Sequence, residues 1–529
     1  MRLANIITDK GTKYTDAVER VKRVYKQDDR PWIIGYSGGK DSTATCTVVL
    51  NALSELPKEE LRKHVYIISS DTLVETPLII DEINTTLHLM EEFGRKQGLP
   101  ISTHKVQPEY DNSFWANLIG RGYPCPNQTF RWCTDRMKIE PANRFIKKVV
   151  AANGEAIMVL GVRKGESSSR DRVLESHTVK SSDLMRHTTL ANAFTFAPII
   201  EFTVDDVWDV LLNYPCPWGG DNKKLFKLYI DSSTTTECPL VVDEATKNSA
   251  GSCGNSRFGC WVCTVVSEDK ALSGFIKNGT RWLIPMLEYR NWLFSVRDDR
   301  TMRMKRRATG QIYFSAVSEK NDKLIITKKG DREKVEINIK TGVDSSGKTW
   351  NIFESKNDAI KYIKDNKIDL ASKKDPRIIC KMNDGYGQLG LGPFIFEERK
   401  EMLRRLLKLQ KKLKDEFDID YELIKKEELL AISKLWLEQG YWGNDVCNIY
   451  KEVFGLDLDF ISDDVKLLNE AESKVLEDIC INNEVDFELM KKMIFLEKNS
   501  YGLTRRESTQ KNITRLLNQD YVYVQKVGI

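Results

Sequence analysis

Short apolar runs alternate with longer amphipathic stretches through the first half of the chain. Apolar runs of this length predict strands that are buried on both faces, as in a parallel sheet. The runs cover residues 33–36, 64–72 and 156–162, and stretches with helical periodicity follow the first two, at 41–53 and 75–98. Residues 101–106 are a further short predicted strand. The β-α-β-α-β order predicts an α/β fold with a doubly wound, mostly parallel sheet.

The pattern changes towards both ends of the chain. Helical periodicity over residues 10–30 predicts a helix before the first strand, whereas alternating residues over 311–345 predict a small β insertion. Helical periodicity returns after residue 391. A chain of 529 residues is too long for one core. We therefore predict four parts, namely an N-terminal helix (1–30), an α/β domain (31–300), the β insertion (301–390) and a helical C-terminal domain (391–529).

Composition narrows the class of protein only slightly. The chain is 41% hydrophobic and 30% charged, with a net charge of +4, which allows nucleic-acid binding without requiring it. No apolar run approaches the roughly 18 residues of a membrane span. The first residues lack the apolar core of a signal peptide. We expect a cytoplasmic protein without membrane contact, whose eleven cysteines form no disulfide framework.

A glycine-bearing turn follows the first predicted strand and opens a helix. Glycines allow a ligand to approach the backbone, and amides at a helix N-terminus bind anions. Hydroxyl groups and one lysine add further donors. The turn is therefore predicted to hold the phosphates of a nucleotide, although an ordinary βα turn is the alternative. Its residues are Ser37, Gly38, Gly39, Lys40, Asp41 and Ser42.

Polar residues also lie at the ends of two other predicted strands. Asp71 and Thr72 are the last residues of the second strand. Gly161 lies near the end of the fourth strand, Arg163 follows it, and Arg170 comes further on. The carboxyl ends of parallel strands share one edge of a sheet, where ligands bind. Arginines at this edge suit an anionic ligand. A solvated loop with Arg–Glu pairs is the alternative for the arginines.

Three cysteines lie in one Gly-rich stretch. Cys260 and Cys263 form a C-x-x-C pair, and Cys253 precedes them. Thiolates at this spacing suit an iron–sulfur cluster or zinc, and a filled site needs a fourth ligand from elsewhere. A metal-free redox pair and a purely structural cluster are the alternatives.

Two further segments are rich in basic residues. Arg and Trp or Tyr are interleaved between Arg281 and Arg307, as in surfaces that pair with phosphates and stack on bases. The predicted helix that starts at Phe396 carries Arg399, Lys400 and Arg404. Solvated faces of amphipathic helices are an equally good interpretation of both segments.

Several of these motifs together resemble one family. The phosphate turn, Ser70-Asp71-Thr72, the segment 131–141, Gly161-Val162-Arg163 and the segment 198–208 resemble the phosphoadenosine phosphosulfate (PAPS) reductases, in the same order. The chain lacks the Glu-Cys-Gly-x-His tail of the thiol-type reductases. It also has Trp132-Cys133 where the cluster-bearing reductases have an adjacent cysteine pair. Both departures argue against reduction of an activated sulfate.

The segments 215–222, 237–241, 252–264 and, more weakly, 390–395 look like the DndC family, the PAPS-reductase-like component of DNA phosphorothioation. This resemblance implies an ATP pyrophosphatase and sulfurtransferase that replaces a non-bridging oxygen of the DNA backbone by sulfur. It implies ATP with Mg²⁺ and a 4Fe-4S cluster, with zinc as the alternative metal. The implied partners are DNA, a cysteine desulfurase as sulfur donor, and sister Dnd-type proteins.

We assign expected roles accordingly. The expected catalytic residues are Lys40, Asp41, Arg163 and Arg170, while Ser37–Ser42, Asp71, Thr72, Gly161 and Arg163 would bind the nucleotide. The expected metal ligands are Cys133, Cys253, Cys260 and Cys263, with Cys125 and Cys238 as replacements for Cys133. A sulfonucleotide reductase, a tRNA thiolase and a nucleic-acid-binding subunit that uses ATP as a switch are the alternative functions.

Overall fold

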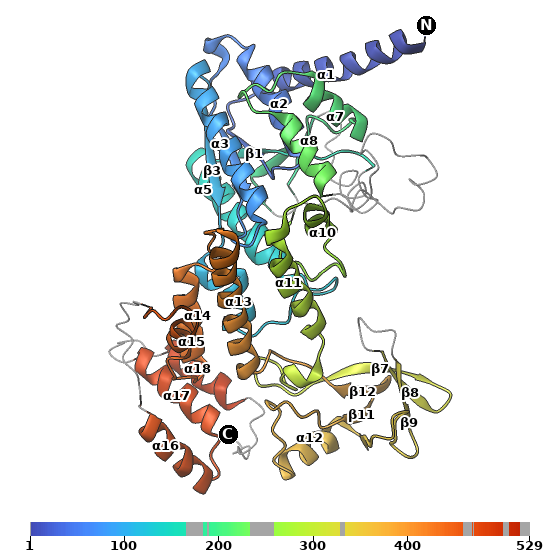
Figure 1. Ribbon diagram of the computed structural model, residues 1–529, viewed down its shortest axis with the longest axis vertical. Coiled ribbons are helices and arrows are strands. Elements are labelled where there is room, and N and C mark those ends of the chain that lie inside the picture. Colours follow the sequence, from blue (N-terminus) through green and yellow to red (C-terminus); the bar gives the residue numbers. More distant parts are fainter. Residues whose placement is uncertain are drawn as a thin grey trace. The chain divides into compact units, whose positions relative to one another are not determined.

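The computed structural model divides into two compact units (Figure 1). It describes residues 2–165, 183–187, 190–232, 259–327, 334–458, 468, 470–500 and 507–518. Unit 1 comprises Met1–Glu109 and Gln128–Leu287, and unit 2 comprises Tyr110–Asn127 and Glu288–Ile529. Within the described ranges, no helix is both long enough and apolar enough to cross a bilayer.

Unit 1 is built on a six-stranded sheet with the order β3-β2-β1-β4-β6-β5. All neighbouring strands run parallel except β5 and β6 at one edge, which are antiparallel. The strands are β1 (Trp32–Gly35), β2 (Val65–Ser70), β3 (Ile101–Val106), β4 (Ala156–Val159), β5 (Leu184–Arg186) and β6 (Ala193–Phe196). The predicted α/β class with a mostly parallel sheet is confirmed. The strand order reverses between β1 and β4, and ligands bind at such a point in open parallel sheets.

Helices cover both faces of this sheet. Ile146 and Val149 of α5 pack with Ile33 of β1, whereas Tyr25 of α1 meets the ring of Trp32. Because successive strand residues point to opposite faces, α1 and α5 lie on opposite sides. The helices of unit 1 are α1 (Arg2–Lys26), α2 (Lys40–Ser54), α3 (Pro77–Gln97), α4 (Trp132–Thr134), α5 (Glu140–Asn153), α7 (Val204–Asn213), α8 (Asn222–Asp231) and α10 (Lys270–Lys277), and α11 (Ile284–Val296) continues into unit 2.

Unit 2 contains a second six-stranded sheet, with the order β10-β11-β12-β7-β8-β9. Helix α12 (Lys356–Asp365) packs on it through Ala359 and Ile363. The strands are β7 (Phe314–Lys320), β8 (Lys323–Thr327), β9 (Lys334–Asn338), β10 (Asn351–Phe353), β11 (Ile378–Met382) and β12 (Gly385–Leu389). The predicted β insertion is present, but it is twice as large as the three strands that alternation indicated.

In the described part of unit 2, six further helices and a short inserted segment accompany this sheet. The segment Tyr110–Asn127 packs against them, since the Trp115 indole donates to the Leu423 carbonyl at 2.7 Å and the Trp436 indole donates to the Ile119 carbonyl at 3.0 Å. The helices are α13 (Phe396–Phe417), α14 (Lys426–Glu438), α15 (Asp445–Phe454), α16 (Glu470–Asn482), α17 (Phe487–Ser500) and α18 (Glu507–Leu517). The helical C-terminal region is confirmed, and α15 was not foreseen.

Most basic residues between Arg281 and Arg307 are internal rather than on a surface. Arg303 donates to the Gly392 carbonyl, and Lys305 donates to the Ser372 carbonyl at 2.6 Å. Five of these residues are less than 9% exposed, namely Arg290, Arg297, Arg303, Lys305 and Arg306. These five buried residues therefore form neither a nucleic-acid-binding surface nor the solvated face of a helix. They satisfy backbone carbonyls and carboxylates inside unit 2 instead.

Candidate active site

The phosphate turn joins β1 to α2 at the point where the strand order reverses. Gly38 has φ +72°, and a Cβ atom there would lie 2.6 Å from Cγ1 of Ile83. Both facts require glycine. Gly39 is extended and forms the N-cap of α2, without a side-chain cap on the helix. The turn therefore brings backbone close to a potential ligand at a helix N-terminus, where the dipole favours an anion.

Hydroxyl groups hold the turn in shape. Ser42 Oγ donates to the Gly39 carbonyl at 2.9 Å and accepts from the Ser37 amide at 3.2 Å. The Ser37 and Ser42 hydroxyls are 3.1 Å apart. From outside the turn, the buried Tyr229 of α8 accepts a hydrogen bond from the Lys40 amide at 3.1 Å. The cradle is thus preorganised, which lowers the cost of binding.

Asp41 links the turn to the end of β4. Its Oδ1 accepts from Arg163 Nε at 2.5 Å, and its Oδ2 lies 3.2 Å from the Lys40 ammonium. Arg163 is only 4% exposed, so it pairs with Asp41 and not with a loop glutamate in solvent. Gly161 permits this approach, because a Cβ atom there would lie 2.8 Å from the Asp41 carbonyl oxygen. The structure brings Lys40, Asp41, Gly161 and Arg163 together, while Arg170 lies outside the described residues.

Asp71 and Thr72 continue the same edge at the end of β2. Asp71 accepts from Gln107 Nε2 at 2.8 Å and from the Leu73 amide at 2.9 Å. Leu73 adopts φ +64°, a strained conformation for a side-chain-bearing residue, of the kind that gathers at functional sites. Thr72 is fully buried and donates to Glu75 Oε1 at 2.9 Å. The strand end is therefore tightly constrained.

The C-x-x-C segment attaches to this strand end. Cys260 forms an isolated β-bridge with Glu75, and the Trp261 amide donates to the Val74 carbonyl at 3.1 Å. The Cys260 thiol lies 3.4 Å from the Thr72 hydroxyl. Burial first, and the nearby Glu75 carboxylate second, raise the pKa of Cys260 well above its ordinary value. This thiol is protonated at neutral pH unless a cation or metal stabilises its anion.

The other described cysteines of the predicted metal site lie near Cys260. Burial raises the pKa of Cys133, and Cys263 raises it further through its charge. The charge of Cys263 also raises the pKa of Cys260. Lys138 completes the group, because its ammonium lies 3.7 Å from Glu75 Oε1 and its pKa is raised by Cys260 and then by Glu75. The three thiols share one electrostatic neighbourhood.

These three thiols do not by themselves form a metal site. Among the described residues, no three His, Cys, Asp or Glu side chains are placed to hold one ion. The fourth predicted ligand, Cys253, and the alternative Cys238 lie outside those residues. The other alternative, Cys125, belongs to unit 2, where burial raises its pKa to about 12 although Arg303 and Arg297 oppose the shift. The metal site thus stays a prediction.

Sequence reasoning missed three contributors to this edge. Glu75 and Lys138 were visible only as neighbours of the predicted motifs, and pairing them needs the fold. Lys138 lies in a π-helical turn (Asp135–Ile139), a feature that often marks functional positions. Tyr229 meets Lys40 across 189 residues of sequence, so no local signal could have identified it.

Comparisons with known proteins agree with this geometry. Residues 31–265 match the phosphoadenosine phosphosulfate reductase domain. Two uncharacterized proteins of Methanocaldococcus jannaschii are 25% identical over 226 residues and 24% identical over 173 residues, which are 43% and 33% of this chain. The matches span 40% and 34% of the length of these relatives.

Solved structures resemble the chain only distantly. The U34-tRNA thiolase of Methanococcus maripaludis, with its [4Fe-4S] cluster, has a TM-score of 0.26 and 11% identity, covering 54% of this chain and 81% of its own. The NH3-dependent NAD synthetase of Campylobacter jejuni has a TM-score of 0.26 and 12% identity, and the match covers 54% of this chain and 95% of the synthetase. These likenesses are too weak to indicate function. Residues 31–265, the part of the chain that matches the phosphoadenosine phosphosulfate reductase domain, contain the phosphate turn and the six-stranded, mostly parallel sheet.

Proposed function

We propose that this protein is an ATP pyrophosphatase and sulfurtransferase that installs sulfur in the DNA backbone, as the resemblance to the DndC family implies. One observation carries the proposal. The phosphate turn follows β1, and Thr72 with its contact Cys260 follows β2, the parallel neighbour of β1. Nucleotide binding and thiol chemistry therefore belong to the same edge of one sheet.

The chain's own residues would bind MgATP and stabilise charge. The N-terminus of α2 and the Lys40 ammonium would hold phosphate oxygens, with Mg²⁺ arriving on the nucleotide. Arg163 would keep the Asp41 carboxylate, and with it the start of α2, in place through their 2.5 Å ion pair. Phosphoryl chemistry needs mainly such positioning and electrostatic stabilisation.

The proposed reaction has two balanced steps without any change of oxidation state. A DNA phosphate oxygen attacks the α-phosphorus of ATP, so that a P–O–P bond to AMP forms and pyrophosphate leaves. Hydrosulfide then attacks the DNA phosphorus. AMP leaves with the original oxygen, and a proton is released. A non-bridging oxygen is thereby replaced by sulfur.

Pyrophosphate release tests the nucleotide site. Lys40→Ala should lower pyrophosphate release from MgATP and DNA by about 100-fold or more, since a preorganised charge contributes on this scale. Lys96→Ala, on an exposed position of α3, is the matched control and should leave the rate unchanged. Full turnover by the Lys40 variant would refute the assignment of the turn.

Product analysis tests the sulfur chemistry. Incubation of the protein with DNA, MgATP and hydrosulfide should yield phosphorothioate dinucleotides after nuclease digestion, detected by mass spectrometry. A sulfonucleotide reductase is the second candidate, because residues 31–265 match the reductase domain. Release of sulfite from phosphoadenosine phosphosulfate with a thiol reductant, without phosphorothioate, would favour that candidate.

Metal analysis tests the proposed ligands Cys133, Cys253, Cys260 and Cys263. A bound iron–sulfur cluster would either bind the incoming sulfur at an iron atom or hold the surrounding loops rigid. Anaerobically purified protein should contain iron and acid-labile sulfide, and Cys263→Ala should lose them. Cys46→Ala, a fully buried cysteine of α2, is the control that should retain the metal. Stoichiometric zinc would identify the alternative metal, and metal-free protein would refute the site.

A further inference from the structure

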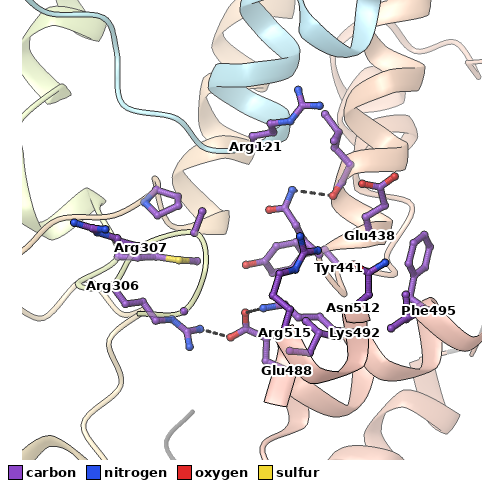
Figure 2. A pocket seen from close by; sticks show the side chains of 18 of the residues that line it. Arg121, Arg306, Arg307, Glu438, Tyr441, Glu488, Lys492, Phe495, Asn512 and Arg515 are labelled. Carbon is purple, nitrogen blue, oxygen red and sulfur yellow. Dashed lines mark hydrogen bonds and ion pairs between the residues drawn. The ribbon is translucent and has the colours of Figure 1, made fainter. Parts of the chain in front are cut away.

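Unit 2 contains a cavity of about 610 Å³ that the proposed function does not use (Figure 2). It is lined by the inserted segment, the stretch after α11, and helices α13, α14, α17 and α18. Its volume lies in the range of pockets that hold small organic ligands and far exceeds the size of an inorganic ion. All of its lining residues belong to unit 2.

The cavity is strongly basic. Six basic and two acidic residues line it, the basic ones being Arg121, Arg306, Arg307, Arg399, Lys492 and Arg515. Glu488 is already neutralised within the protein, because Arg306 and Lys492 both pair with it. Burial alone would raise its pKa, but these two cations lower the pKa of Glu488 to about 2. The other four basic residues leave an excess of positive charge that suits an anion.

Arg399 is the buried member of this set. It is 1% exposed, and its Nη1 donates to the Gly120 carbonyl at 2.7 Å and to Gln439 Oε1 at 2.8 Å. Nε and Nη2 lack a hydrogen-bond partner of normal geometry, although the Tyr441 ring lies 5.1 Å from the guanidinium carbon. Burying charged donors without acceptors is costly. A bound oxyanion would remove this cost.

Aromatic and carboxylate groups give the cavity a second chemistry. Tyr441 and Phe495 line it, together with Glu438. Figure 2 shows Arg306 and Arg307 on one side and Phe495 on the other, with Tyr441 and Arg515 between them. Aromatic faces stack on nucleobases, and a carboxylate accepts hydrogen bonds from ribose hydroxyls.

We propose that this cavity binds a 5′-phosphorylated nucleoside, with the phosphate on the arginines, the base against Tyr441 or Phe495, and the ribose on Glu438. Planar guanidinium groups suit phosphate because they donate in pairs. The ligand is either a free nucleotide or the 5′ end of a strand, since both carry this chemistry. The site is separate from the phosphate turn and does not depend on the proposed function.

Calorimetric titration with AMP tests the site in full-length protein that carries Lys40→Ala, which weakens nucleotide binding at the phosphate turn. One equivalent of AMP should bind, and inorganic phosphate should compete. Replacing Arg307 and Arg515, two exposed residues, by glutamine should weaken binding about tenfold or more, as expected for two charge-assisted contacts.

A second double variant controls for general loss of charge. Lys414→Gln with Lys511→Gln removes two exposed cations of unit 2 that do not line the cavity, and AMP affinity should change less than twofold. Equal effects of both double variants, or no AMP binding in the Lys40→Ala protein, would overturn the proposal.

A comparison of two oligonucleotides shows whether the ligand is a free nucleotide or the 5′ end of a strand. A 5′-phosphorylated oligothymidylate is compared with its 5′-hydroxyl counterpart in the same Lys40→Ala protein. Tighter binding of the phosphorylated strand, lost in the Arg307/Arg515 variant, would support the end of a strand as ligand. Binding of AMP without this difference would support a free nucleotide.

Discussion

Asp41 is the residue on which the proposed nucleotide site depends most. Its carboxylate faces both Lys40 and Arg163, and its carbonyl oxygen lies where a side chain at position 161 would have to go. Such shared contacts make individual substitutions non-additive. Asp41 therefore partly balances the charge of Lys40, and a nucleotide bound at the proposed site would compete with Asp41 for that charge.

Gly161→Ala tests this crowding. The new methyl group would lie 2.8 Å from the Asp41 carbonyl oxygen and would push the start of α2 away from Arg163. We expect a stability loss of about 1 to 3 kcal/mol from overpacking and at least tenfold weaker ATP binding. Gly259→Ala, where a methyl group meets nothing within 4 Å, is the matched control. Unchanged ATP affinity in the Gly161 variant, measured by titration, would contradict the prediction.

Glu428 provides a test of pH dependence. It is fully buried in unit 2, and burial raises its pKa to about 7 from an ordinary 4.5. The folded state therefore binds the proton more tightly than the unfolded state. The resulting stability is complete below pH 4.5 and is lost as the pH rises through about 7.

Glu428→Gln should remove this dependence, because glutamine can still accept from the Lys425 amide, as Glu428 does at 2.9 Å. At pH 8 the variant should be more stable, on the order of 2 to 3 kcal/mol, and the gain should vanish near pH 5. Denaturant unfolding at pH 5 and at pH 8 measures this difference in stability. Equal effects at pH 5 and pH 8 would argue against a titrating carboxyl.

At the scale of elements, α7 shows how closely local rules can specify a helix. Thr203 accepts from the Asp206 amide at 3.2 Å, and Asp206 accepts from the Thr203 amide at 2.7 Å. A threonine N-cap with an acidic residue three positions later is sufficient to form this reciprocal capping box. Lys13 of α1 adds an ion pair to Asp206 at 2.9 Å, which fastens the cap to a neighbouring helix.

Thr203→Ala should lower the stability of unit 1 by about 1 kcal/mol, as is typical for the loss of an N-cap. Thermal unfolding followed by circular dichroism measures it. Thr85→Ala is the control, because Thr85 lies within α3 and its hydroxyl bonds only to the Asp81 carbonyl of the preceding turn. That change should be neutral or slightly stabilising. A loss at Thr85 as large as at Thr203 would show that capping is not the cause.

Elements with a strong local pattern could be predicted from the sequence. β3 (Ile101–Val106) has the predicted bounds, and α3 (Pro77–Gln97) lies within the predicted range 75–98, because Pro77 suits a first turn and Gly98 a helix end. β12 (Gly385–Leu389) was missed because its two glycines lack strand preference, and pairing with β7 and β11 determines it. α1 begins at Arg2 and not at residue 10.

The candidate site was predictable where its residues adjoin a motif and not where it depends on distant contacts. The phosphate turn and the strand ends follow from topology, because parallel strands end at one edge. The partners Tyr229 of Lys40 and Lys138 of Glu75 come from separate elements. The burial of Arg303 and Lys305 was also hidden, since a basic sequence does not reveal whether backbone carbonyls surround it.

For the whole molecule, the most important feature is that the two units are not consecutive in the sequence. Residues 110–127 belong to unit 2, although unit 1 precedes and follows them in sequence. Trp115 anchors this segment, being fully buried and bonded to the Leu423 carbonyl. The stability of unit 2 therefore depends on residues encoded within unit 1.

Trp115→Ala should destabilise unit 2 by about 3 to 5 kcal/mol, as for other large buried side chains. Hydrogen exchange should accelerate in α13 and α14 while α2 keeps its protection. Trp208→Ala is the matched variant in unit 1, where Trp208 packs against Phe226 and Tyr229. It should show the reverse pattern. Equal acceleration in both units by either variant would show that they unfold as one.

The placement of residues 110–127 also has a consequence for synthesis. A ribosome releases this segment long before α13 and α14, the helices that cover it, have been made. Phe114, Trp115, Leu118 and Ile119 are all at most 2% exposed in the finished protein. The nascent chain must therefore carry an apolar stretch without its partners for some three hundred residues of translation, a period in which such segments invite aggregation or chaperone binding.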